Sequence, residues 1–99
     1  MCGAPHQTQE LPLGIDLSKH TVLAGMVRSA GEPAAGAFVR LLDGTGEFTA
    51  EVVSSATGEF RFFAAPGNWT VRALHRSGNG DAAVQAGGPG LFAVEVTID

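Results

Sequence analysis

The feature that most constrains the fold is a repeated alternation of apolar and polar residues over short segments. It occurs in residues 21–28, 37–43, 48–54, 59–65, 69–76 and 91–98. A period of two places alternate side chains on opposite faces of a β-strand, and no window shows the spacing of an amphipathic helix. We therefore predict an all-β chain whose strands each turn one apolar face to a common core.

Turn-forming residues separate these segments. Asp43-Gly44-Thr45-Gly46 predicts a hairpin, and Ala56-Thr57-Gly58 and Pro66-Gly67-Asn68 predict further tight turns. Residues 77–90 (SGNGDAAVQAGGPG) are expected to form a long loop that could hold one short strand at 82–85. Six or seven short strands with close turns favour a two-layer sandwich.

The first 18 residues show no clear period, and Pro5, Pro12 and Gly14 interrupt them. We expect an N-terminal arm at 1–18, either flexible or docked on the surface, followed by one β-sandwich domain at 19–99. Residues 1–10 have neither a basic stretch nor an apolar run of the signal-peptide type, so the expected location is the cytoplasm.

Charge and composition argue against several classes of partner. The net charge is −4, and the six Lys and Arg residues are scattered, so nucleic acid is not an expected partner. No apolar run approaches the roughly 18 residues of a membrane span.

The sequence also lacks the usual catalytic patterns. It contains no nucleophile elbow, no phosphate-binding loop followed by a helix, and only one cysteine for a metal site. We therefore expect a non-enzyme without cofactor or metal.

Some apolar residues depart from the alternation. Phe38, Leu42 and Phe63 fall on the faces opposite the expected core, beside Arg40 and Arg61. One interpretation is that a loop or the N-terminal arm covers them. The other is that Phe38, Arg40, Leu42 and Phe63 form an exposed patch for a partner or a homodimer, since Arg and aromatic residues are enriched in interfaces.

Cys2 is the residue with the clearest chemical potential. Removal of Met1 would leave an N-terminal cysteine, whose neighbouring ammonium lowers the thiol pKa and favours the thiolate. Such a thiol can accept a sulfane sulfur or form a disulfide. The alternative is a tail cysteine without a role.

The motifs Gly25-x-Val27, Gly31-x-Pro33, Gly36-Ala37-x-Val39-x-Leu41, Thr57-Gly58-x-Phe60-x-Phe62 and Pro66-Gly67-x-Trp69-x-Val71 resemble the carboxypeptidase regulatory-like domain. This resemblance covers about residues 21–76. It implies a seven-strand Greek-key sandwich of the transthyretin (prealbumin) type. It implies no particular function, because such modules serve many proteins.

A second resemblance covers nearly the whole chain. It rests on Met1-Cys2, on the stretch 38–43 (FVRLLD), on 47–53 (EFTAEVV), on 60–67 (FRFFAAPG) and on 78–81 (GNGD). These segments are similar to the SseC-type family, small bacterial proteins of unassigned function that are encoded beside rhodanese-type thiosulfate sulfurtransferases. The resemblance implies an accessory protein in sulfur metabolism with a rhodanese-type partner, in which Cys2 accepts or relays sulfane sulfur. The alternative is a pure interaction module or homo-oligomer in which Cys2 has no role.

Overall fold

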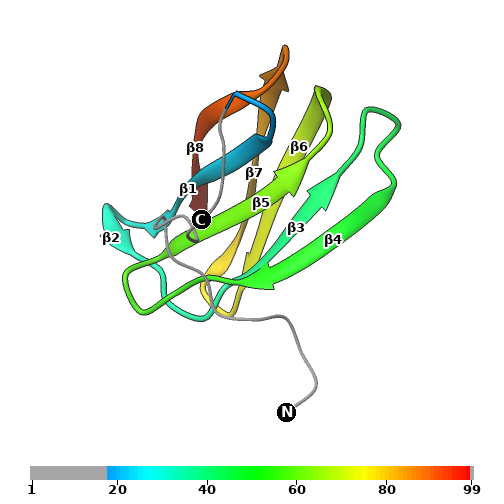
Figure 1. The fold of residues 1–99 in the computed structure, drawn as a ribbon. Coiled ribbons are helices and arrows are strands. Elements are labelled where there is room, and N and C mark those ends of the chain that lie inside the picture. Colours follow the sequence, from blue (N-terminus) through cyan, green and yellow to red (C-terminus); the bar gives the residue numbers. More distant parts are fainter. Residues whose placement is uncertain (1–17, 99) are drawn as a thin grey trace.

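The computed structural model describes residues 18–98, which form two facing β-sheets (Figure 1). The first, called here the β1 sheet, contains β1 (Thr21–Ser29), β2 (Glu32–Pro33), β5 (Glu59–Ala64) and β8 (Gly90–Ile98). The second, the β3 sheet, has the order β4-β3-β6-β7, with β3 (Phe38–Leu42), β4 (Phe48–Val53), β6 (Gly67–His75) and β7 (Gly78–Ala86). The predicted all-β sandwich is confirmed.

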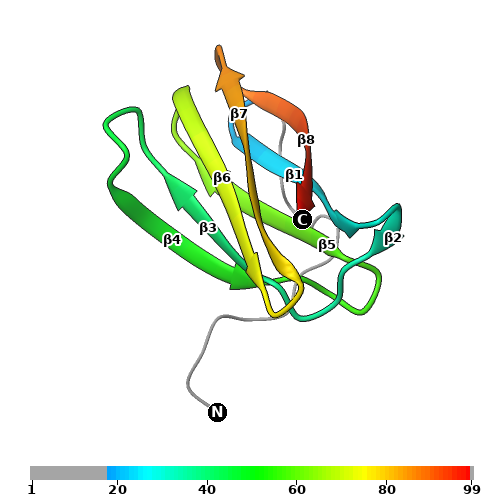
Figure 2. The ribbon, with the colours of Figure 1, turned by 180° about the vertical axis from the view of Figure 1, so that it is seen from behind.

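Strand β1 lies at the centre of its sheet. Strands β5 and β2 pair with it antiparallel along one edge, and β8 pairs with it in parallel along the other, from Thr21↔Gly90 to Ser29↔Ile98. The chain crosses between the sheets before β3, after β4, after β5 and after β7, whereas β3–β4 and β6–β7 are hairpins within one sheet (Figures 1 and 2). The eighth strand, beyond the seven expected, is the two-residue β2.

The expectation of a long loop at 77–90 is wrong, because Gly78–Ala86 is a full strand. It pairs with β6 over its whole length, from His75↔Gly78 to Gly67↔Ala86. Its sequence is poor in β-branched residues, so local propensity gives little sign of a strand. Gly80 is required there, because a Cβ atom would lie 2.0 Å from the carbonyl oxygen of Thr97 on β8.

The core fills the space between the sheets with the inward residues that the alternation predicts. Each sheet contributes a row of fully or nearly fully buried side chains, among them Leu23, Val27, Val39, Leu41, Phe60, Phe62, Val71, Ala73, Val94, Val96 and Ile98. The Phe60 and Phe62 rings pack with centroids 5.9 Å apart. In residues 18–98 no helix is long and apolar enough to span a membrane.

Ser54 is a fully buried polar residue whose hydrogen bonds connect the loop before β3 to the end of β4. Its hydroxyl donates to the Ala34 carbonyl at 2.7 Å and accepts from the Ala37 N–H at 2.9 Å. The Ser54 N–H also donates to the Ala37 carbonyl. One side chain therefore satisfies two buried backbone groups.

We predict that Ser54→Ala lowers the free energy of unfolding by about 1–3 kcal/mol, because the Ala37 N–H and the Ala34 carbonyl lose their buried partner. Urea unfolding measures the change, with Ser29→Ala at the partly exposed end of β1 as the control. Equal stability of the two variants would contradict a structural role for the Ser54 hydroxyl.

Asp43 organises the β3–β4 turn. Its carboxylate accepts from the Thr45 hydroxyl at 2.6 Å, from the Glu47 N–H at 3.0 Å and from the Thr45 N–H at 2.9 Å. These hydrogen bonds, that of the Thr45 hydroxyl first, hold the Asp43 pKa below its ordinary value of 3.8. The ionised form is thus the one that the folded turn prefers.

A lowered carboxyl pKa contributes stability that is present above the unfolded-state pKa and is lost as the pH falls through the folded-state pKa. We expect Asp43→Asn to be less stable than the wild type at pH 7, with the difference shrinking below about pH 4. Urea unfolding between pH 7 and pH 2.5 tests this. Glu47→Gln is the control, because Glu47 meets Asp43 through its backbone. A pH-independent difference would refute the linkage.

Candidate protein-binding face

The outer face of the β3 sheet combines exposed aromatic residues with charge. Phe38 and Arg40 project outward from β3, since the inward side of this strand is taken by Val39 and Leu41. The Phe38 side chain is 49% exposed, and Phe48 on the neighbouring strand β4 is 61% exposed. Phe48 pairs with Leu42 across a register shift, and Leu42 alternates onto the same side of β3 as Phe38 and Arg40, so both exposed aromatic side chains belong to this face.

A row of charged residues crosses this face between the two aromatic residues. The strand register aligns Glu51 with Arg40, Arg40 with Arg72, and Arg72 with Asp81, so the row spans all four strands. Arg40 Nε donates to Glu51 Oε2 at 2.8 Å, and Arg72 Nη2 donates to Asp81 Oδ2 at 3.4 Å. The order is acid, base, base, acid.

The two arginines at the centre of that row have no negative charge between them among the described residues. Arg40 and Arg72 are register neighbours, and directly opposed like charges destabilise a sheet. Each guanidinium is drawn to an acid on its outer side, and both side chains are nearly half exposed. An additional carboxylate at the centre would relieve this repulsion.

A shallow hollow of about 470 Å³ adjoins Phe38, and it is lined by Ala35, Gly36, Phe38, Leu74, His75 and Arg76. His75 lies at the rim of this hollow and is held there by hydrogen bonds. The imidazole Nε2 lies 3.2 Å from the Ala35 carbonyl, which can only accept, so Nε2 carries the proton. Nδ1 then accepts from the Ser77 N–H at 3.1 Å, beyond the end of β6.

The four predicted patch residues do not form one surface. Phe38 and Arg40 share the outer face of the β3 sheet, but Phe63 lies on β5 in the other sheet, on the opposite side of the sandwich (Figure 1). Leu42 is only 8% exposed, because it lies between Phe48 on β4 and Thr70 on β6, next to a register irregularity in β3. The prediction of a single patch that includes Leu42 and Phe63 is therefore wrong.

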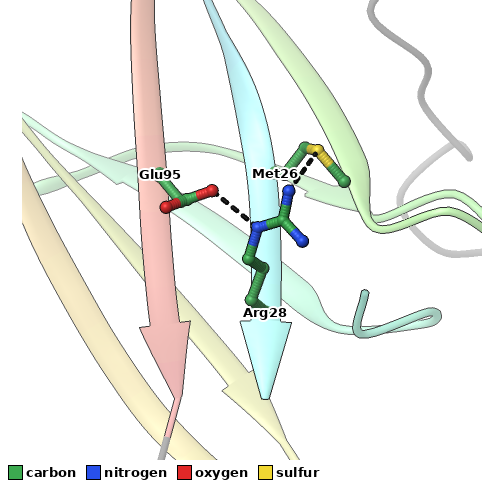
Figure 3. Close-up of polar contacts among 3 residues, drawn as sticks. All are labelled: Met26, Arg28 and Glu95. Carbon is green, nitrogen blue, oxygen red and sulfur yellow. Dashed lines mark hydrogen bonds and ion pairs between the residues drawn. The ribbon is translucent and has the colours of Figure 1, made fainter. Parts of the chain in front are cut away.

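The outer face of the β1 sheet has a different character. Arg28 Nε donates to Glu95 Oε2 at 2.6 Å, and Arg28 Nη2 lies 3.5 Å from the Met26 sulfur (Figure 3). Arg61 stacks on Phe63, with its guanidinium carbon 5.4 Å from the ring centroid. Phe63 and Leu91 are about half exposed on this face, at 50% and 51%.

Cys2, the predicted sulfur acceptor, lies outside the described residues. Among residues 18–98 there is no group of three or more His, Cys, Asp or Glu side chains that could hold a metal ion.

The sequence did not single out Phe48, Arg72 or Asp81 as site residues. Arg72 and Leu74 alternate with the core residues Val71 and Ala73 and so point outward, but their nearness to Arg40 and Phe38 depends on the β3–β6 register. Two arginines at outward positions of different strands are the only sequence signal of the charged row.

Solved structures with the same fold include oxygenases. Catechol 1,2-dioxygenase from Pseudomonas arvilla C-1 superposes with a TM-score of 0.64 over 97% of this chain and 58% of that chain, at 13% identity. The dioxygenase domain of a dioxygenase–carbohydrate-binding protein fusion from Streptomyces sp. SirexAA-E superposes with a TM-score of 0.61. The match covers 98% of this chain and 90% of that chain, at 12% identity. The chain spans about three fifths of the catechol dioxygenase, and identities this low show the fold alone.

Sequence relatives are much closer. The uncharacterized protein Rv0814c of Mycobacterium tuberculosis is 59% identical over 99 residues, covering 99% of each chain. An uncharacterized protein of Mycolicibacterium smegmatis is 58% identical over 89 residues, covering 89% of this chain and 99% of its own. Residues 2–98 match the family described as "Protein of unknown function (DUF1416)", and the chain belongs to that family.

Proposed function

We propose that the chain is a non-catalytic accessory protein that acts by binding a partner protein through the outer face of its β3 sheet. The observation that carries the proposal is the arginine pair, Arg40 and Arg72, set side by side between the exposed rings of Phe38 and Phe48. Exposed aromatic residues and arginine are the residue types that supply most interface energy.

The geometry favours a partner of one chemical type. A partner carboxylate between Arg40 and Arg72 would be bound by two guanidinium groups in a partly desolvated site, where charge-assisted hydrogen bonds are strong. A neighbouring apolar side chain would enter the hollow beside Phe38 and Leu74. The preferred partner surface is therefore an acidic residue flanked by apolar ones.

A homodimer through the same face, stacked in register, is the less favoured alternative. The row reads acid, base, base, acid from β4 to β7, so it is the same in both directions. A two-fold stacking that keeps this row in register with its own copy sets arginine against arginine and acid against acid. Repulsion of this kind disfavours the wrong partner and supports a different protein as the occupant.

The resemblance to SseC-type proteins suggests which protein that is. We propose a rhodanese-type sulfurtransferase as the partner and Cys2 as the acceptor of its sulfane sulfur. The Cys2 thiolate attacks the outer sulfur of the enzyme's cysteine persulfide. A new S–S bond forms on Cys2, the S–S bond on the enzyme breaks, and the enzyme's cysteine leaves as a thiolate. No external oxidant is consumed.

For the binding face, we expect Phe38→Ser to weaken binding to the sulfurtransferase by about 10-fold or more, the usual effect of losing an anchor residue. Calorimetric titration of the full chain measures this. Phe63→Ser is the matched control, because Phe63 is equally exposed but lies on the other sheet. Weakening by Phe63→Ser alone would place the interface on the β1 sheet and contradict the proposal.

For the sulfur step, we expect incubation with thiosulfate and the sulfurtransferase to add the mass of one sulfur atom to Cys2, reversibly under a reductant. Intact mass spectrometry followed by peptide mapping measures this, with Cys2→Ser as the control. No gain by the wild-type chain, although it binds the enzyme, would remove the relay and leave the docking role standing.

A further inference from the structure

We propose that residues 11–17 of this chain dock on the outer face of the β1 sheet, over β1 and β5. This inference is independent of the partner-binding proposal, because it concerns the opposite face of the sandwich and a segment of the chain itself.

The first observation is an unexpected pattern of burial. Val22 and Ala24 alternate with the inward residues Leu23 and Gly25, so their side chains point to the outer side of β1. They are nonetheless only 0% and 6% exposed. Phe38, which points outward from the central strand β3 of the other sheet, is 49% exposed.

Nothing among residues 18–98 explains that burial. Within this range no strand or other element lies over the outer face of the β1 sheet in either view (Figures 1 and 2). The register neighbours of Val22, which are Phe63 on β5 and Leu91 on β8, are themselves about half exposed. A covering segment must therefore come from the remainder of the chain or from another molecule.

The path of the chain favours the remainder of this chain. Ser18 and Lys19 form a turn immediately before β1. Both edges of β1 are occupied at Thr21, by Ala64 and by Gly90, and the inner side is the packed core. The outer face is the side of β1 that stays open to a segment reversing at this turn.

The sequence of the segment suits the face. Residues 11–17 read LPLGIDL, so apolar side chains alternate with Pro12, Gly14 and Asp16 and would share one side of an extended segment. Seven extended residues span about 23 Å, against about 30 Å for the nine residues of β1. The apolar stripe consists of Leu11, Leu13, Ile15 and Leu17.

The charge of the N-terminal segment is opposite to that of an arginine on this face. Arg28 is already engaged by Glu95, but Arg61, beside Ala24 on β5, has a buried Nε without a hydrogen-bond partner among the described residues. The charged side chains of residues 1–17, with His6 neutral, are Glu10 and Asp16, both acidic. Glu10 and Asp16 lie on the side of the extended segment opposite the apolar stripe, so an acidic segment over β1 and β5 attracts this guanidinium through its net charge rather than through a direct contact.

The docked segment lies toward β5 and leaves the β8 side open. Leu91 and Ala93 on β8 are exposed, and a shallow hollow of about 360 Å³ lies between them and the β8-facing side of Ala24 and Met26. The family match begins at residue 2, so this segment belongs to the sequence that the family shares.

The decisive measurement is the set of nuclear Overhauser effects in the full-length, methyl-labelled protein. We expect contacts from the methyl groups of Leu13, Ile15 and Leu17 to those of Val22 and Ala24. Random-coil shifts for residues 11–17 without such contacts would overturn the proposal. So would contacts to Phe38 and Leu74, or contacts that appear only in an isotope-filtered mixture and thus come from a second copy.

A matched pair of variants provides the second test. We expect Ile15→Asp to lower the thermal midpoint by about 4 °C or more and to shift the Val22 and Ala24 methyl resonances. Thr8→Asp, which adds the same charge outside the apolar stripe, should leave both unchanged. Identical behaviour of the two variants would refute docking through residues 11–17.

Discussion

The parallel pairing of β1 with β8 is the constraint on which the rest of the structure depends. It joins the first and last described strands over nine register pairs and places Val94, Val96 and Ile98 in the core. The backbones approach so closely that a Cβ atom on Gly25 would lie 1.4 Å from the Val94 carbonyl oxygen, so this position requires glycine. With β5 on its other edge, β1 becomes a central strand with both edges satisfied.

That pairing also makes the two outer faces unequal. On the β1 sheet the outward residues Val22 and Ala24 of the central strand are buried, whereas on the β3 sheet the outward Phe38 of the central strand is exposed beside a charged row that spans all four strands. The first face suits an intramolecular cover, and the second suits a partner. A segment held on the β1 sheet would also anchor the arm that carries Cys2. Leu11 is nine positions after Cys2, so the thiol could reach at most about 30 Å from the docked segment.

Much of the fold could be predicted from residues alone. The inward set from Leu23 to Ile98 follows from alternation, and the Asp43 turn follows from its Asp and Gly residues. Strand β7 could not be predicted, because its partner β6 and the close approach of β8 at Gly80, rather than its own propensities, hold it in place. The candidate site was predicted only in part: Phe38 and Arg40 are on the exposed face, but Leu42 is buried and Phe63 belongs to the other sheet.

The sequence by itself determined the strands other than β2 and β7, and which side of those strands faces the core, because side-chain alternation is a local property with a period of two. The tertiary structure alone decided which strands are neighbours. Sheet membership and register arise from backbone pairing between distant residues, and no local pattern records them. That non-local choice set Arg40 beside Arg72, separated Phe63 from Phe38, and left Val22 and Ala24 as outward residues that are nonetheless buried.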